Sequence, residues 1–337
     1  MGSFTSKNEF PVGGRTVLIT GGSSGLGLSA ACQLAAKGAN VIIVARDPNR
    51  LKAAVDQIQA HAHSPSTQRF TTIEADATGS ADCKIIINNA TSWNNNTPPD
   101  IVWCCSGSAH PTLFIDTPVD EFRNMMASNY FSCVYMAHAI LNKWLRESED
   151  ASSSATGSRP PARHIVFTGS FVSFFSFAGF TPYAPSKAAI RSLSDSLSQE
   201  MNLYNAANPH LPAVRVHTVF PATMPTRSLD DENKVKTDLT KSLEEGDQIL
   251  SPDECARRAI AGLERGEELV ATSAIIRLVM TSVLGGCIRG GLIKGLVDTV
   301  LGWIVSVVMI FIRWDMDVKV AKWGRKNGTS GMKNTQS

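Results

Sequence analysis

Short, continuous apolar runs alternate with longer segments of helical apolar spacing along most of the chain. Valine and isoleucine fill the runs without a polar alternation, which is typical of strands buried on both faces of a parallel sheet. We expect strands at 15–20, 40–44, 70–75, 100–105, 164–168, 213–219 and 268–271. We expect helices at 26–37, 48–60, 80–93, 118–145, 182–204 and 251–263. This alternation predicts an α/β fold with a doubly wound parallel sheet of about seven strands.

Two stretches depart from the alternation. Residues 147–161 are rich in serine, alanine, proline and charge, which predicts a disordered surface loop. Residues 299–312 carry no charge, and Arg313 and Trp314 follow as an anchor pair for a membrane interface. We therefore interpret 1–272 as one domain and 273–337 as a hydrophobic, membrane-associated helical tail.

The alternative for the tail is a buried C-terminal helix, since its uncharged stretch is shorter than the ~20 residues that span a bilayer. The sheet is already complete upstream, which favours a membrane-embedded or interfacial segment. Basic residues beyond the apolar stretch favour a cytoplasmic C-terminus if the tail inserts. They are Lys319, Lys322, Arg325 and Lys326.

Composition narrows the class of protein. The 337 residues are 43% hydrophobic, enough for a substantial core, and the net charge of +2 leaves no footprint for nucleic acid. None of the seven cysteines forms a Cys-x-x-Cys motif, so we expect a reducing compartment and no metal site. The first residues also fit the loose N-myristoylation pattern at Gly2.

The first predicted strand runs directly into a glycine-rich turn, Thr20-Gly-Gly-Ser-Ser-Gly-Leu-Gly27. Gly21 permits a tight turn, Gly25 lets the backbone approach a pyrophosphate, and Gly27 lets the next helix pack closely. The helix N-terminus then offers N–H groups and its dipole to the phosphates. This arrangement predicts a Rossmann-type dinucleotide site. Its candidate residues here are Gly21, Ser23, Ser24, Gly25, Leu26 and Gly27.

The end of the second strand indicates which dinucleotide binds. Enzymes that use NAD place an acidic residue there to hold the ribose hydroxyls, whereas this chain has Ala45 followed by Arg46. An arginine suits a 2′-phosphate, and Arg50 lies one helical turn further on. We therefore expect NADPH as the cofactor, with Asp76 placed to reach the adenine ring.

Tyr183 and Lys187 lie four residues apart where a helix is expected to begin. This spacing places both side chains on one helical face. A nearby ammonium favours the phenolate, so we expect Lys187 to lower the tyrosine pKa from its usual ~10. Such a pair would act as a tuned general acid or base.

Taken together, the glycine turn, Thr168-Gly-Ser170 and Tyr183-x-x-x-Lys187 resemble the short-chain dehydrogenase/reductase family over about 15–271. The resemblance implies that Tyr183 exchanges a proton with the substrate oxygen and that Lys187 assists it while holding the nicotinamide ribose. It also implies that Ser170 orients the carbonyl, with Ser173 a lesser candidate, and that Asn129 completes a proton relay.

Other matches to the family are partial. Pro221 to Thr226 resembles its Pro-Gly segment, with Ala222 in place of glycine and Thr226 expected to face the carboxamide. The usual Asn-Asn-Ala-Gly after the fourth strand is replaced by Cys104-Cys-Ser-Gly107. The Asn-Asn-Ala at 88–90 falls in a predicted helix and is therefore not that motif.

Within the family, the chain resembles reductases of long-chain keto amino alcohols that act at the endoplasmic reticulum and face the cytosol. That resemblance implies a lipid substrate, a membrane partner and a homodimer. Five phenylalanines near the serine suggest an apolar wall for such a chain. They are Phe171, Phe174, Phe175, Phe177 and Phe180. A reductase of steroid or retinoid ketones and a catalytically silent NADPH-binding scaffold remain as alternatives.

Overall fold

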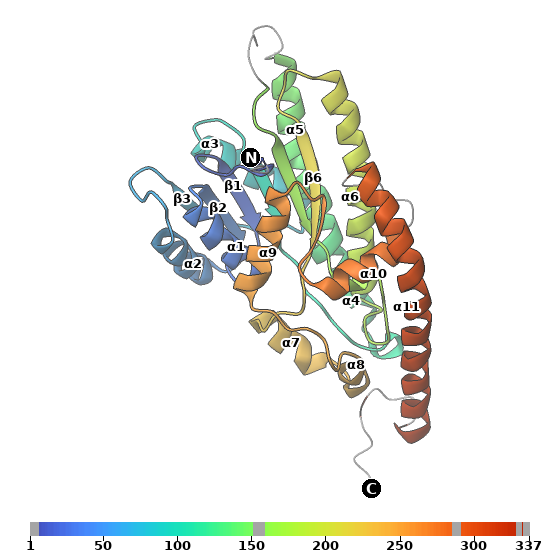
Figure 1. The fold of residues 1–337 in the computed structure, drawn as a ribbon. Helices are drawn as coiled ribbons and strands as arrows, with labels where there is room; N and C mark the ends of the chain where they lie inside the picture. The colour runs from blue at the N-terminus through green and yellow to red at the C-terminus, as the bar shows by residue number, and fades with distance from the viewer. Residues whose placement is uncertain (1–6, 151–158, 285–290, 328–331, 333–337) are drawn as a thin grey trace.

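A parallel sheet of seven strands forms the centre of the molecule in the computed structural model, which describes residues 7–150, 159–284, 291–327 and 332 (Figure 1). The strand order is β3-β2-β1-β4-β5-β6-β7, with every pairing parallel. The strands are β1 (Thr16–Thr20), β2 (Asn40–Ala45), β3 (Phe70–Glu74), β4 (Ile101–Cys104), β5 (Arg163–Thr168), β6 (Val214–Phe220) and β7 (Leu269–Ala271). The predicted fold class and its strands are confirmed.

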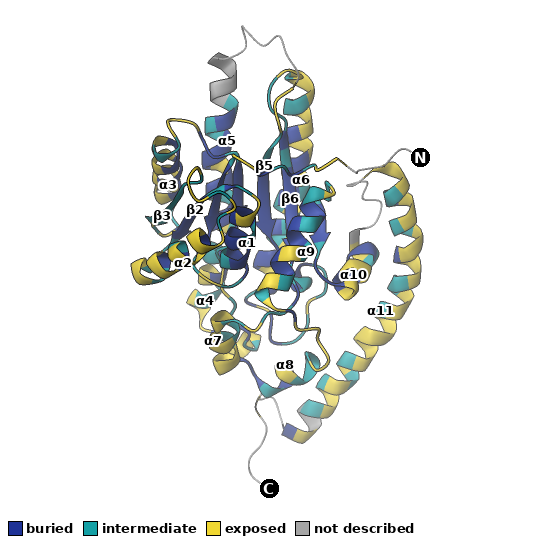
Figure 2. Ribbon diagram, turned by 60° about the vertical axis from the view of Figure 1, so that its left-hand side comes forward, coloured by how far each residue is buried: buried dark blue, intermediate teal, exposed yellow. Residues whose placement is uncertain are grey.

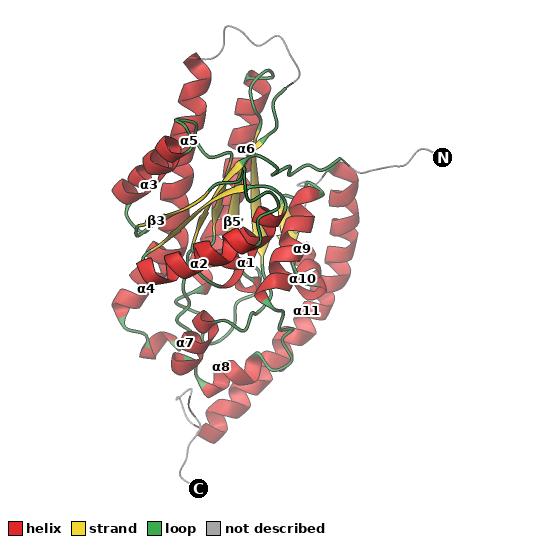
Figure 3. Ribbon diagram, turned by 90° about the vertical axis from the view of Figure 1, so that its left-hand side faces the viewer, coloured by secondary structure: helices red, strands yellow, loops and turns green. Residues whose placement is uncertain are grey.

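Helices cover both faces of the sheet (Figure 3). The α-helices are α1 (Gly25–Ala36), α2 (Pro48–Ala60), α3 (Ser80–Trp93), α4 (Val119–Met125), α5 (Ser132–Asp150), α6 (Ala184–Ala207), α7 (Arg227–Val235), α8 (Asp238–Leu243), α9 (Pro252–Glu264), α10 (Ala274–Leu284) and α11 (Leu292–Asn327). Short helical turns are η1 (Phe114–Asp116), η2 (Met126–Phe131) and η3 (Phe171–Ser173). One hydrophobic core joins the sheet to α1, α2, α9 and α10, and a second joins it to α3, α5 and α6.

The strands read as continuous apolar runs because they supply both cores. In β1, Val17 and Ile19 pack into the first core and Leu18 into the second, and all three are fully buried. Alternate side chains of a strand point to opposite faces, so a sheet covered on both sides requires apolar residues at every position.

Several predicted boundaries differ from the structure. The expected single helix at 118–145 is interrupted by the π-helical turn η2, and α5 continues to Asp150 into the expected loop at 147–161. The central part of that loop lies outside the described residues, as does Gly2. Two helices, α7 and α8, were not expected, because their sequence is polar and lacks a continuous apolar stripe.

The tail forms two helices with different surroundings. Ile276 and Met280 of α10 are buried in the first core, so this part of the tail does have a place against the domain. In contrast, α11 runs along the outside of the domain beside α10 and α8 (Figure 1). Its surface is largely exposed (Figure 2), and Leu292–Trp323 is long and apolar enough to cross a membrane, with mean hydropathy 2.2 and 11% of its most apolar window buried.

Candidate functional site

One cavity of about 1360 Å³ opens at the carboxyl ends of the strands, where a doubly wound sheet places its ligand. The predicted site residues, which come from elements far apart in the sequence, all line it. They are Gly21, Ser23, Ser24, Gly25, Leu26, Gly27, Arg46, Arg50, Asp76, Asn129, Ser170, Tyr183, Lys187, Ala222 and Thr226. The fold therefore gathers them into one site, although their individual roles stay predictions.

The glycine turn between β1 and α1 is held too closely for side chains. Gly21 has φ +69°, and a Cβ there would lie 2.8 Å from the Ser106 nitrogen. A Cβ on Gly27 would lie 2.4 Å from the Gly21 carbonyl oxygen. The turn, the loop after β4 and the first turn of α1 thus press together, and backbone N–H groups at the start of α1 border the cavity, as a pyrophosphate cradle requires.

At the far end of the cavity, the β2 end presents Arg46 to solvent. Its Nη1 lies 3.8 Å from an Asp76 carboxylate oxygen, and its side chain is 79% exposed. Arg50 is held one turn along by Asp47, at 3.2 Å. An exposed ion pair of this length stabilises the fold little, so the guanidinium is available for a 2′-phosphate. The residues present fit NADPH.

Ser170 begins the short turn η3 after β5. Its backbone N–H donates to Ser173 Oγ at 3.2 Å, and the Val172 N–H donates to Ser170 Oγ at 3.4 Å. The Ser173 hydroxyl is buried and donates to the Lys187 carbonyl at 3.0 Å. Ser173 therefore fixes the turn against α6, and Ser170 is the serine of the pair that lines the cavity.

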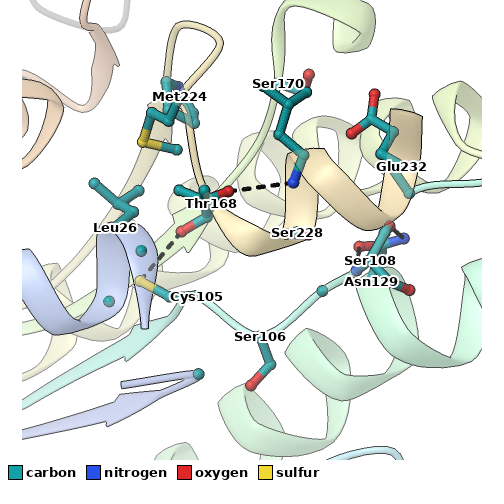
Figure 4. A pocket seen from close by; sticks show the side chains of 18 of the residues that line it. Leu26, Cys105, Ser106, Ser108, Asn129, Thr168, Ser170, Met224, Ser228 and Glu232 are labelled. Carbon is teal, nitrogen blue, oxygen red and sulfur yellow. Dashed lines mark hydrogen bonds between the residues drawn. The ribbon is translucent and has the colours of Figure 1, made fainter. Parts of the chain in front are cut away.

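Asn129 is fully buried in the π-helical turn η2 and is locked to the loop after β4. Its Nδ2 donates to the Ser108 carbonyl at 3.0 Å, and its Oδ1 accepts from the Ser108 N–H at 3.2 Å (Figure 4). A Cβ on Gly107 would lie 2.4 Å from Asn129 Oδ1 and 3.6 Å from Lys187 Nζ. The glycine of the altered Cys-Cys-Ser-Gly motif is thus needed for the side chains behind it.

Lys187 is buried behind the tyrosine, and its Nζ donates to the Thr168 carbonyl at 2.9 Å. Burial lowers the pKa of this ammonium, and the neighbouring thiols Cys133 and Cys105 partly oppose the shift. Burial also raises the pKa of Cys105 to about 12, while the Thr168 hydroxyl donates to its sulfur at 3.6 Å (Figure 4). The cysteine that replaces a family asparagine is therefore a protonated packing group beside the lysine.

The expectation that Lys187 lowers the tyrosine pKa is wrong for this geometry. Burial raises the pKa of Tyr183, the Glu232 carboxylate raises it further, and a hydrogen bond with Ser170 opposes both. Lys187 Nζ lies 5.6 Å from the centre of the tyrosine ring and is directed to the Thr168 carbonyl. The phenol is therefore protonated at neutral pH, which suits a proton donor.

Glu232 on α7 is a cavity residue that the sequence did not reveal (Figure 4). It accepts from Lys236 Nζ at 2.9 Å, and its side chain is 16% exposed. The same ammonium, 2% exposed, is 2.6 Å from Glu244, and Asp247 also lines the cavity. We call Glu232, Glu244 and Asp247 the carboxylate wall, because these three acidic side chains share one neighbouring lysine, Lys236. The sequence features that could have predicted α7 and α8 are the N-cap threonines Thr226 and Thr237. The side chain of each accepts a backbone N–H at the start of its helix.

The predicted phenylalanine wall is divided between surroundings. Phe171, Phe177 and Phe180 line the cavity. Phe174 instead packs against Phe220 in the core, at 4.5 Å between ring centres. Phe175 faces a different cavity, beside α11.

Known proteins are similar to this chain in sequence. Residues 15–237 match the family model described as short chain dehydrogenase. The chain is 42% identical over 328 residues to 3-ketodihydrosphingosine reductase ksrA of Aspergillus fumigatus, covering 95% of this chain and 88% of that protein. It is also 42% identical over 329 residues to 3-ketodihydrosphingosine reductase gsl-3 of Neurospora crassa, covering 97% and 87%.

Solved structures share the fold at lower identity. A short-chain dehydrogenase from Sphingobium yanoikuyae in complex with NADPH has a TM-score of 0.61 at 23% identity, covering 77% of this chain and 88% of that one. A short chain dehydrogenase/reductase from Burkholderia phymatum in complex with NAD has a TM-score of 0.65 at 18% identity, covering 80% and 94%.

Proposed function

The chain belongs to the short-chain dehydrogenase family, and from this premise we propose that it is an NADPH-dependent 3-ketodihydrosphingosine reductase. The observation that carries the proposal is the convergence of Asn129, Ser170, Tyr183 and Lys187 in one cavity with a dinucleotide turn. A silent scaffold would not need this complete set. The two relatives of that name, each 42% identical over nearly the whole chain, support the choice of substrate.

The cofactor, when bound, supplies a hydride to the keto carbon. Tyr183 gives its phenolic proton to the substrate oxygen, which becomes the hydroxyl of the product. The Ser170 hydroxyl donates a hydrogen bond to the same oxygen and stabilises its developing charge. Lys187, fixed by the Thr168 carbonyl, would hold the nicotinamide ribose, and Asn129, bonded to the Ser108 backbone, completes the relay that replaces the proton.

A charged wall supports an amino ketone over a steroid or retinal. 3-Ketodihydrosphingosine carries an amine next to its ketone, and this amine is cationic when protonated. Glu232 lines the same cavity as Tyr183, and its carboxylate raises the pKa of the phenol. When the ketone oxygen of the substrate contacts the phenol, the neighbouring ammonium group therefore lies near this carboxylate. Steroid ketones and retinal carry no such charge and gain nothing from this wall.

The exposed apolar helix α11 supports membrane association. In the same proposal the tail, residues 273–337, attaches the catalytic domain, residues 1–272, to the cytosolic face of the endoplasmic reticulum. Two copies pair through α5 and α6. Carbonate extraction of membranes, with and without the segment from Leu292 onward, tests the attachment, and the mass of the purified protein in detergent tests the pairing.

A substrate panel tests the reaction itself. The purified full chain is assayed by NADPH oxidation with 3-ketodihydrosphingosine, a steroid ketone and retinal, and with NADH replacing NADPH. We expect turnover with the amino ketone and NADPH, and formation of dihydrosphingosine. Turnover of the steroid ketone or retinal alone would overturn the proposed substrate, and turnover with none of the three would favour a silent scaffold.

A further inference from the structure

A second cavity lies outside the catalytic one, between α11 and the segment that follows Ser170. Its volume is about 470 Å³, within the range of small-molecule sites. We call it the chain groove, and its lining residues are Phe175, Ser282, Val283, Ser306, Met309, Ile310, Arg313, Trp314 and Asp317.

The polar groups of the chain groove are largely engaged with other partners. Arg313 Nε lies 3.3 Å from Asp317, and Arg313 Nη1 donates to the Ser176 carbonyl at 3.0 Å. The Ser282 hydroxyl donates to the Val279 carbonyl of its own helix at 2.7 Å. The remaining lining is aromatic, aliphatic or thioether, so the groove suits an uncharged hydrocarbon.

Two neighbouring aromatic rings belong to the linings of the two cavities. Phe171 lines the catalytic cavity and Phe175 lines the chain groove, and their ring centres are 6.1 Å apart in an edge-to-face arrangement. The backbone here is continuous with the catalytic serine. Ser176 Oγ donates to the Val172 carbonyl at 3.2 Å, and the Val172 N–H donates to Ser170 Oγ. One short segment therefore touches the reacting end of the site and the groove.

The other wall of the chain groove is α11, whose apolar side chains are largely exposed. Gly302 lies where α11 meets α10, and a Cβ there would lie 2.6 Å from the Thr281 carbonyl oxygen of α10. Large apolar side chains of α11 are exposed, among them Trp303, Val307 and Phe311. A helix with exposed apolar side chains is suited to the acyl-chain region of a membrane. The groove therefore lies where the domain would meet lipid.

We propose that the chain groove is the binding site for the alkyl chain of the lipid ketone. The chain passes the Phe171–Phe175 pair while its polar end reaches Ser170 and Tyr183. This inference rests on the proposed function. It assigns α11 a second role, as one wall of the substrate site, in addition to membrane attachment.

Filling the groove tests the proposal. Ser306→Trp places a large ring in it from α11, and Val283→Trp does so from α10. Val307→Trp is the matched control, because Val307 is the next residue along, is exposed and is not part of the groove lining. The full chain is assayed with 3-keto amino alcohols of decreasing alkyl length. NADPH binding and thermal unfolding of each variant establish that it is folded.

For the wild type we expect KM to fall about fourfold for each methylene group that the groove buries. Both groove-filling variants should lose this dependence for long chains, with KM for the longest substrate raised at least tenfold, and keep wild-type kcat/KM for the shortest. Val307→Trp should behave as wild type. Unchanged chain-length dependence, or an equal loss for every length, in both folded groove variants would overturn the proposal.

A binding measurement separates this proposal from the reaction. Tryptophan fluorescence of the full chain in detergent is titrated with a dibrominated long-chain alcohol, since Trp314 lines the groove. Quenching in wild type and Val307→Trp that is weaker in both groove-filling variants supports the groove, even if no ketone is reduced. Equal quenching in all four proteins overturns it, even if 3-ketodihydrosphingosine is reduced.

Discussion

Gly107→Ala probes the arrangement on which catalysis depends. The added Cβ would lie 2.4 Å from Asn129 Oδ1 and 3.6 Å from Lys187 Nζ, and both of these side chains are buried. Relief of this contact requires a shift of about 1 Å toward the ~3.4 Å of an ordinary contact, and a misplacement of that size in an active site costs roughly 10²-fold in rate. If Asn129 moves, it also loses hydrogen bonds to Ser108, and a buried unpaired polar group costs about 1–3 kcal/mol.

The assay is steady-state NADPH oxidation together with thermal unfolding. We expect kcat of Gly107→Ala to fall roughly 10²-fold and its Tm to fall by several degrees. Gly13→Ala is the control, because a Cβ there would meet only the Lys37 carbonyl oxygen at 3.7 Å, an ordinary contact. Wild-type kcat in Gly107→Ala would refute the reasoning, since Asn129 would then not need the position it has in this structure.

Three further predictions concern titrating groups. Tyr183→Phe should abolish reduction while leaving NADPH affinity, measured by fluorescence, nearly unchanged; retained turnover would reject the proton donor. Glu232→Gln should lower the pKa of Tyr183, moving the alkaline limb of the pH–rate profile to lower pH, and should reduce the preference for an amino ketone over its des-amino analogue by about 5- to 150-fold (~1–3 kcal/mol); the exposed Glu245→Gln is its control, and equal effects on both substrates would contradict the assigned contact. Burial and His217 hold the pKa of His164 well below its usual value, so in acid the unfolded chain binds a proton at this imidazole that the folded chain does not. The free energy of unfolding should therefore decrease as the pH is lowered through about 6.5, by up to ~1.4 kcal/mol per pH unit. A flat profile of unfolding free energy in urea between about pH 7 and 5 would count against this lowered pKa of His164.

The sequence predicted those parts of the candidate site whose residues lie close together in the chain. The turn at 20–27 and the Tyr183/Lys187 pair each lie within a few residues, so spacing alone predicted a dinucleotide turn and a candidate acid/base pair. Glu232 was not readable, because it comes from a polar helix that no apolar period marks and approaches Tyr183 only when α7 folds over the cavity. The sequence also could not predict that the phenylalanines would be divided between surroundings. Phe174 and Phe175 are neighbours in sequence, yet Phe174 faces the core and Phe175 faces α11.

The direction of the tyrosine pKa shift shows the limit of local spacing. Four residues along a helix bring Lys187 near the ring, but its ammonium is directed to the Thr168 carbonyl of β5, and burial controls the phenol. Likewise, the apolar content of the tail indicated a helix with unusual surroundings, while only the packing of α10 and α11 decided which half joins the core.

The order of strands and helices, the glycine-rich turn and the choice of candidate reacting side chains follow from the linear pattern, because period, glycine position and residue type are local properties. The electrostatic state of those side chains, the carboxylate wall and the two-cavity arrangement were decided by tertiary structure. They depend on desolvation and on contacts between segments distant in the chain, and neither is encoded in any single stretch of residues.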